Sequence, residues 1–148
     1  RRSGWADPQK ARPSLRLRTT RRPRRVEQVA TGEHLTDAER SALDRTVRRA
    51  EQLTRFEFSV YVGPTEGDDT HAFATRLHNR LVAPARSVLI LVDPRRRVTE
   101  VVTGGDVRRR LSDAEAELAV LDMQSAFGES GIAAGLQRGV AMLAEHAR

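Results

Sequence analysis

The sequence predicts an α/β domain, a three-layer α/β/α sandwich with a small mixed sheet and helices at the C-terminal end. Residues 87–93, SVLILVD, form a continuous apolar run, which is typical of a strand covered on both faces. Residues 56–63, FEFSVYVG, alternate between apolar and polar positions and predict a half-buried strand. Helical apolar periodicity precedes, separates and follows these strands, so helices are expected on both faces of the sheet.

The first helix is predicted over residues 35–54. Thr36 followed three positions later by Glu39 is typical of a capping box, in which each side chain satisfies a backbone N–H group of the other residue. The expected apolar stripe recurs with helical spacing and consists of Leu43, Val47, Ala50 and Leu53.

A second helix is predicted over residues 69–82, with Asp69 as its cap and with Ala72, Phe73, Leu77 and Leu81 as its apolar side. Because this helix joins the strands at 56–63 and 87–93, those strands are expected to be parallel in a right-handed crossover. The turn that Asp93-Pro94 opens is only a few residues long, so the strand at 97–104 should pair antiparallel with 87–93. The strand at 87–93 is then central, and Leu89, Ile90 and Leu91 should each be less than about 10% exposed.

Beyond Gly104-Gly105 the chain is expected to be helical. Residues 106–111 suit a single turn, and Ser112 with Glu115 forms a second capping box for a helix that runs to about Phe127. Gly128 and Gly131 are expected to break that helix before a last helix over 131–146. Glycines at 131, 135 and 139 would form one small-residue groove, for which a contact between helices of the same chain is favoured over a dimer seam.

Charge divides the chain into two parts. Ten of its 26 basic residues lie in the first 25 positions, beside the single acid Asp7. Residues 26–148 carry 16 arginines against 19 acidic residues, a formal charge of −3. A basic, flexible arm is therefore predicted over residues 1–32 and a near-neutral domain over 33–148, because the arm has too little apolar content to fold alone.

The arm is predicted to become ordered only against a partner. A basic run of this density attracts phosphates or anionic lipid head groups, and an aromatic side chain within it could anchor a contact. The candidate partner-binding residues are Trp5, Arg16, Arg18, Arg21, Arg22, Arg24 and Arg25. The other arginine clusters, 95–97 and 108–110, are interpreted as solvated.

LTDAERSALDRTVRRAE followed by FEFSVYVG resembles the start of a TPM domain. SVLILVDPRRRVTEVVTG, LSDAEAELAV and AFGESGIAAGLQRGVAML are similar to the rest of that domain in the same order, so the resemblance covers residues 33–146. The compact, arginine-rich form looks most like an uncharacterised actinobacterial branch of that family. The resemblance implies an α/β/α sandwich, and in some members acid-phosphatase activity and divalent-metal binding. This chain departs from the family pattern, with Ala85-Arg86-Ser87 where many members carry an Asn and with a basic turn at 95–97.

Four carboxylates are weak metal candidates, and no metal site is predicted from them. Asp68 and Asp69 follow the first strand, where open α/β sheets bind ligands, and carboxylate oxygens suit Ca²⁺ or Mg²⁺. Asp106 and Asp113 could join the same cluster if the last helices fold back over the strand ends. Helix caps are the favoured roles for these acids. The histidines are interpreted as surface residues, because His71 and His78 are seven apart rather than the three or four typical of zinc pairs.

No catalytic residues and no cofactor are predicted, and the interpretation leans against an enzyme. The favoured function is a non-catalytic accessory module that docks through its arm and its TPM-like domain. The expected partner is a protein or membrane-protein complex with an acidic or lipid-proximal surface. A metal-dependent acid phosphatase and nonspecific nucleic-acid binding through the arm are the alternatives. The expected location is the cytoplasm, with peripheral membrane association left open. No apolar run approaches the 18 residues of a membrane span, so no segment is expected to cross a bilayer.

Overall fold

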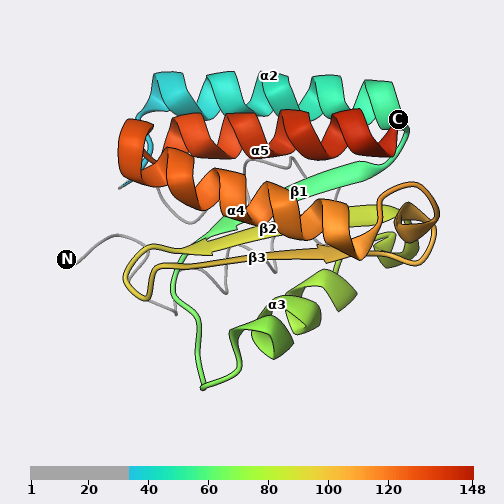
Figure 1. Cartoon of the computed structure of the whole chain (residues 1–148), viewed down its shortest axis with the longest axis horizontal. Coiled ribbons are helices and arrows are strands. Elements are labelled where there is room, and N and C mark those ends of the chain that lie inside the picture. Colours follow the sequence, from blue (N-terminus) through green and yellow to red (C-terminus); the bar gives the residue numbers. More distant parts are fainter. Residues whose placement is uncertain (1–33) are drawn as a thin grey trace.

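The computed structural model describes residues 34–148, so the arm and its candidate binding residues lie outside the described part of the chain (Figure 1). The order of elements is the predicted α-β-α-β-β-α-α. Two single turns of 3₁₀-helix, η2 and η3, lie before β2 and after β3. The elements are α2 (Asp37–Thr54), β1 (Glu57–Val62), α3 (Thr70–Asn79), η2 (Pro84–Arg86), β2 (Ser87–Asp93), β3 (Val98–Thr103), η3 (Val107–Arg109), α4 (Asp113–Ser130) and α5 (Ile132–Ala147).

The strands form a three-stranded mixed sheet in the order β1-β2-β3. β1 and β2 are parallel and are connected through α3, whereas β2 and β3 form an antiparallel hairpin. The turn at residues 94–97 closes that hairpin, and Arg97 adopts a left-handed backbone conformation there with φ 56°. The parallel pairing of β1 with β2, the antiparallel hairpin and the central position of residues 87–93 are confirmed.

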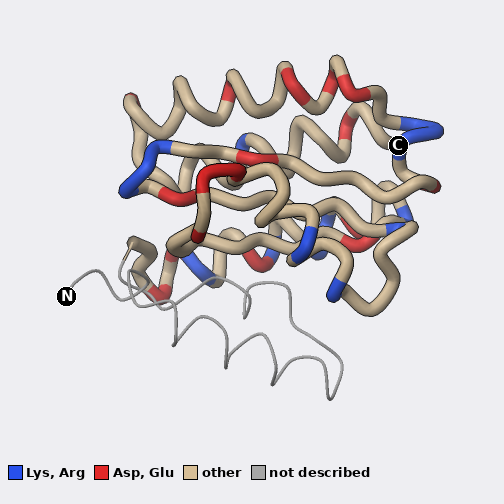
Figure 2. Tube along the Cα trace, turned by 90° about the horizontal axis from the view of Figure 1, so that it is seen from below, with Lys and Arg blue, Asp and Glu red and all other residues tan. Residues whose placement is uncertain are grey.

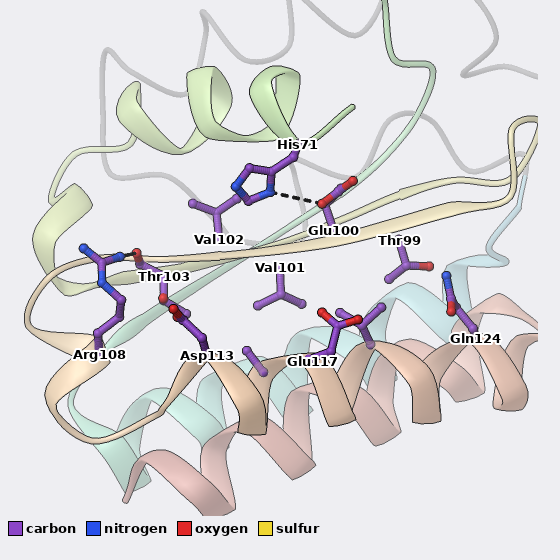
Figure 3. A pocket seen from close by; sticks show the side chains of 12 residues that line it. His71, Thr99, Glu100, Val101, Val102, Thr103, Arg108, Asp113, Glu117 and Gln124 are labelled. Carbon is purple, nitrogen blue, oxygen red and sulfur yellow. Dashed lines mark hydrogen bonds and ion pairs between the residues drawn. The ribbon is translucent and has the colours of Figure 1, made fainter. Parts of the chain in front are cut away.

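Helices cover both faces of the sheet, as predicted (Figures 1 and 3). α3 lies on one face, and α4, α5 and α2 lie side by side on the other, with α5 packed between its two neighbours. Every residue of β2 is buried, and Leu89, Ile90 and Leu91 are 2%, 0% and 0% exposed. Figure 2 shows acidic and basic residues interspersed along residues 34–148.

β1 is buried on both faces, so the prediction of a half-buried strand is wrong. Phe58 and Val60 are inaccessible to solvent, but Ser59 and Tyr61, which point to the other face, are also buried. On that second face, the ring of Phe73 from α3 lies 6.3 Å from the ring of Tyr61. Alternation of polarity therefore records which residues are apolar, but it does not determine which residues are covered in the folded domain.

The helices begin where their caps predict, but α3 and α4 end at residues other than those predicted. Thr36 and Ser112 make the predicted capping boxes, and the Asp69 carboxylate accepts the backbone N–H of Ala72 at 2.9 Å. α3 ends at Asn79, three residues before the predicted boundary, and α4 continues through Gly128 to Ser130.

Two residues depart from their predicted burial. Leu53 is 42% exposed, and Thr54 takes the buried place at the end of α2 and donates its hydroxyl to the Ala50 carbonyl oxygen. His78, interpreted as a surface residue, is 4% exposed. Its Nε2 lies 2.9 Å from the Ser87 carbonyl oxygen, which can only accept, so this nitrogen carries the proton.

The predicted glycine groove serves the packing of α5 on α4. A Cβ atom at Gly135 would overlap the Phe127 ring, and one at Gly139 would overlap the Met123 side chain. Gly131 lies outside the helix and joins α4 to α5 with φ 93°. The favoured contact within one chain is confirmed for Gly135 and Gly139, while Gly131 belongs to the connection.

Candidate functional site

A groove of about 540 Å³ runs along the outer edge of β3 (Figure 3). All of β3 from Thr99 to Thr103 lines it, with α3 on one side and α4 on the other. We refer to it as the β3 groove. Its walls come from segments that only the fold brings together. His71 comes from α3, Arg108 from η3, and Asp113, Ala116, Glu117, Val120 and Gln124 from α4.

The β3 groove contains an unpaired strand edge. The Gly104 N–H donates to the Ser87 carbonyl at 3.0 Å, which makes residues 104 and 87 a hydrogen-bonded pair of the antiparallel ladder. Since such pairs alternate with non-bonded ones, the backbone groups of Thr99, Val101 and Thr103 point away from β2. Within residues 34–148 no strand pairs with this edge, and Arg108 donates to the outward carbonyl of Thr103.

The α3 wall of the β3 groove is held by one carboxylate. Glu100 accepts the Thr70 hydroxyl at 2.7 Å through Oε2, and its Oε1 lies 3.2 Å from Nδ1 of His71. These contacts fasten the first turn of α3 to the middle of β3. They also place the Glu100 carboxylate beside the groove, where its side chain is about four-fifths buried.

The α4 wall presents a stripe of side chains toward β3. Asp113, Glu117, Val120 and Gln124 are spaced four, three and four apart, which places them on one face of the helix. Figure 3 shows Asp113 and Glu117 on the side of α4 that faces β3. With Glu100 on the opposite wall, the described lining residues include three carboxylates and one guanidinium group, that of Arg108. Its charge and shape suit an extended segment that carries basic side chains.

The four predicted carboxylates do not come together. Asp68 and Asp69 follow the carboxyl end of β1, where Asp69 caps α3 and Asp68 is exposed. The Asp106 N–H donates to the Ala85 carbonyl at 2.9 Å, just before β2, and Asp113 opens α4 in the β3 groove. Because β3 is antiparallel to β2, its following residues return to the amino end of β2. The four acids therefore lie apart in the described structure, and not in the single cluster that was the less favoured alternative for them.

A hydrogen-bond network around Asp93 lies at the carboxyl end of the parallel strands, although the sequence pattern indicated only a turn at this residue. Asp93 is 1% exposed, and its Oδ2 accepts the N–H and hydroxyl groups of Thr65 at 2.9 and 2.7 Å. Its Oδ1 accepts the N–H groups of Arg95 and Arg96 at 3.2 and 3.3 Å. Nη1 of Arg96 also donates to the Thr65 hydroxyl oxygen, at 2.9 Å. This edge fastens the loop after β1 to the hairpin turn.

No group of three or more histidine, aspartate or glutamate side chains within residues 34–148 is arranged to hold a metal ion. None of the helices described here has the length and apolarity needed to cross a bilayer. The features that do stand out are a short mixed sheet covered on both faces and an acidic groove along its unpaired edge.

Fold and groove together define a small α/β domain with an accessible sheet edge. The chain belongs to the family described as a domain of unknown function, DUF5130, whose sequence model matches residues 14–144. The match begins within the segment that charge assigns to the arm.

Two curated relatives come from strains of Mycobacterium tuberculosis. They are the uncharacterized proteins MT2543 and Rv2468c, each 31% identical over 102 residues, or 69% of this chain. The aligned region spans 60% of the length of these relatives, so they extend well beyond it.

Solved NMR structures share the fold. The BA42 protein from Bizionia argentinensis has a TM-score of 0.69 at 21% identity, covering 76% of this chain and 81% of that one. An N-terminal domain from P. gingivalis has a TM-score of 0.67 at 21% identity, covering 76% of each chain. The N-terminal domain of cg2496 from Corynebacterium glutamicum has a TM-score of 0.64 at 11% identity, covering 77% and 74%. At these identities the likeness extends to the fold alone.

Proposed function

We propose that the chain is a non-catalytic interaction module that docks on a partner through the β3 groove and the basic arm. The observation that carries this proposal is the unpaired edge of β3 at the base of an acidic groove. An extended segment added to such an edge gains a row of backbone hydrogen bonds, while the side walls select its side chains. Here Glu100, Asp113 and Glu117 favour a segment with basic side chains.

The arm supplies the second contact. Its ten basic residues attract an acidic protein surface or an anionic lipid surface. The rest of the chain is weakly acidic and would not attract such surfaces. The two contacts have opposite charge preferences, so together they select a partner that combines a basic extended segment with an acidic or lipid-proximal surface. A membrane-associated assembly at the cytoplasmic face fits this combination.

The proposal also assigns the domain to the TPM group. The order α-β-α-β-β-α-α and the glycines that seat α5 on α4 support this assignment. The metal-dependent phosphatase activity of some TPM domains is the competing function. Its carboxylates would have to be drawn from acids that here lie at the two ends of β2.

The experiment begins with the full chain as bait in a gentle-detergent extract, followed by identification of the captured protein by mass spectrometry. The purified partner is then added, and backbone hydrogen exchange is followed over residues 98–104. Strand addition should slow exchange at the outward amides of Thr99, Val101 and Thr103. Exchange at Glu100 and Val102, whose amides already bond to β2, should change far less.

Charge-reversal variants separate the groove from general electrostatics. Glu117→Lys should weaken association, whereas Glu129→Lys, an exposed acid at the end of the same helix, should not. Unchanged association in Glu117→Lys, or equal slowing at all amides of β3, contradicts docking in the β3 groove. Hydrolysis of p-nitrophenyl phosphate with Mg²⁺ that is lost in Asp69→Asn or Asp113→Asn would instead establish an enzyme. Salt-sensitive retention of duplex DNA without any protein partner would favour nucleic-acid binding.

A further inference from the structure

A second pocket, of about 510 Å³, lies where the end of α2 meets the 3₁₀ turns η2 and η3. Four arginines from these three segments line it, and we call it the arginine pocket. They are Arg55, Arg86, Arg109 and Arg110. Phe56, which is buried, and Leu53 supply its apolar part, and Asp106 is the one carboxylate among its described lining residues.

Arg86 is held in place by contacts of its own side chain, and the turn that carries Arg109 and Arg110 is closed by backbone hydrogen bonds. The Arg86 guanidinium lies 5.3 Å from the centre of the Phe56 ring, and its Nη2 donates to the Arg55 carbonyl at 2.5 Å. Arg109 and Arg110 end the turn η3, which the bond from the Arg110 N–H to the Val107 carbonyl closes at 2.9 Å. The pocket is thus built from side chains on turns whose backbone is fixed against the sheet.

None of these four side chains forms an ion pair with another described residue. The ion pairs formed within residues 34–148 involve Arg48, Arg138, Arg148 and two histidines, and none involves an arginine of the pocket. Like charges gathered with a single nearby carboxylate repel one another, and that repulsion is relieved when an anion binds.

Backbone conformation at Arg55 points the same way. Arg55 follows the last turn of α2 in the left-handed region, with φ 68°. Glycine occupies this position in most helices that end so, because a side chain strains the backbone there. An arginine at a strained position that lines a pocket with three others is explained by a role for its charge.

We propose that the arginine pocket binds a phosphate monoester group. Such a group carries close to two negative charges and three acceptor oxygens, which suits a pocket lined by four arginines better than a single carboxylate does. The group could belong to a soluble phosphorylated metabolite or to a monoester lipid head group, and the chemistry recognised is the same. This inference does not rest on the β3 groove, whose lining shares no residue with the arginine pocket.

The test is a residue-resolved NMR titration of the full chain with inorganic phosphate, at concentrations up to about 10 mM to detect a millimolar dissociation constant. Residue resolution is needed because the arm also attracts anions. Saturable shifts should appear at the backbone amides of Arg55, Arg86 and 106–110, and chloride at equal ionic strength should not produce them. The double variant Arg109→Gln/Arg110→Gln should weaken binding at least about tenfold. Arg95→Gln, an exposed arginine of the hairpin turn, should leave it unchanged.

Vesicles distinguish the two sources of the phosphate group. Phosphatidylcholine vesicles that contain phosphatidic acid present a monoester, whereas those with phosphatidylglycerol present a diester. Binding to the phosphatidic acid vesicles that the double variant loses selectively identifies a lipid source. Phosphate binding without that preference identifies a soluble one. The inference is overturned if phosphate produces no saturable shifts in the pocket, if chloride reproduces them, or if the double variant binds as tightly as the unchanged chain.

Discussion

Gly104 is the position at which a single methyl group should damage this domain most. It follows β3, is buried, and donates its N–H to the Ser87 carbonyl at 3.0 Å. A Cβ atom there would overlap the carbonyl oxygens of Pro84 and Ala85 and would lie 2.5 Å from the Ala85 carbonyl carbon. Comfortable contacts between carbon atoms are about 3.5–4.0 Å, so the Gly104→Ala chain must move the backbone of η2 away from β3.

The cost follows from what holds η2 in place. Overpacking a well-packed site costs about 1–3 kcal/mol, and the lower values belong to sites where a flexible side chain can yield. Here the obstacles are backbone atoms, and the Asp106 N–H fixes the same Ala85 carbonyl at 2.9 Å. We therefore expect Gly104→Ala to lower the free energy of unfolding by about 3 kcal/mol. In a domain of this size that corresponds to a fall in Tm of about 12 °C.

Gly128 provides the matched control. It lies within α4, and a Cβ atom there meets nothing within 4 Å. Gly128→Ala should raise stability by about 0.5–1 kcal/mol, because alanine loses less conformational freedom than glycine in a helix. Thermal and urea unfolding followed by circular dichroism measure both variants. A Gly104→Ala chain that melts within about 2 °C of the unchanged chain would refute the argument, since the predicted shift is several times larger.

Three further predictions concern the core, the acid limb of stability and the arm. His78→Ala should lower the free energy of unfolding, measured in urea, by about 2–3 kcal/mol, because it opens a cavity and removes the donor to the Ser87 carbonyl. A loss under about 0.5 kcal/mol, which is within the range of surface substitutions, would contradict this. The Ser112 backbone N–H, and after it the Ser112 hydroxyl and His146, hold the pKa of Glu115 below its usual value. This carboxylate therefore contributes stability above the usual carboxyl range that is lost as pH falls through the lowered pKa. Glu115→Gln should flatten that part of a Tm-against-pH profile, and an unaltered profile would count against it. Truncation before Val26 should leave Tm nearly unchanged and weaken partner association much as added salt does, whereas unfolding of the shortened chain would make the arm part of the fold.

Signals confined to a few neighbouring residues predicted the starts of the helices and the topology of the sheet. Thr36 with Glu39 and Ser112 with Glu115 form their capping boxes because each pair lies within one helical turn. The short connection after Asp93 forces an antiparallel hairpin, and the uninterrupted apolar run identifies the central strand. These features are local, so one chain segment contains all the information that they need.

Features that depend on distant segments could not be predicted in the same way. The second face of β1 is buried in the folded domain, where Tyr61 lies against Phe73 of α3, and His78 is buried because α3 brings it against Ser87. Asp68 and Asp69 lie at one end of the sheet and Asp106 at the other, because β3 runs antiparallel to β2 after the hairpin. Polarity along the chain does not record which element will cover a side chain.

The two candidate sites show the same division. The sequence makes the run at 108–110 visible, but nothing in it connects that run with Arg55 and Arg86, which lie far earlier in the chain. Likewise, nothing in the sequence connects the acids of the β3 groove with one another. They line one groove because α3 and α4 pack on opposite faces of the same edge strand. Composition and local spacing determined the charge of the arm, the caps and the order of elements. Only tertiary packing decided which charges converge, because convergence depends on contacts between segments remote in sequence.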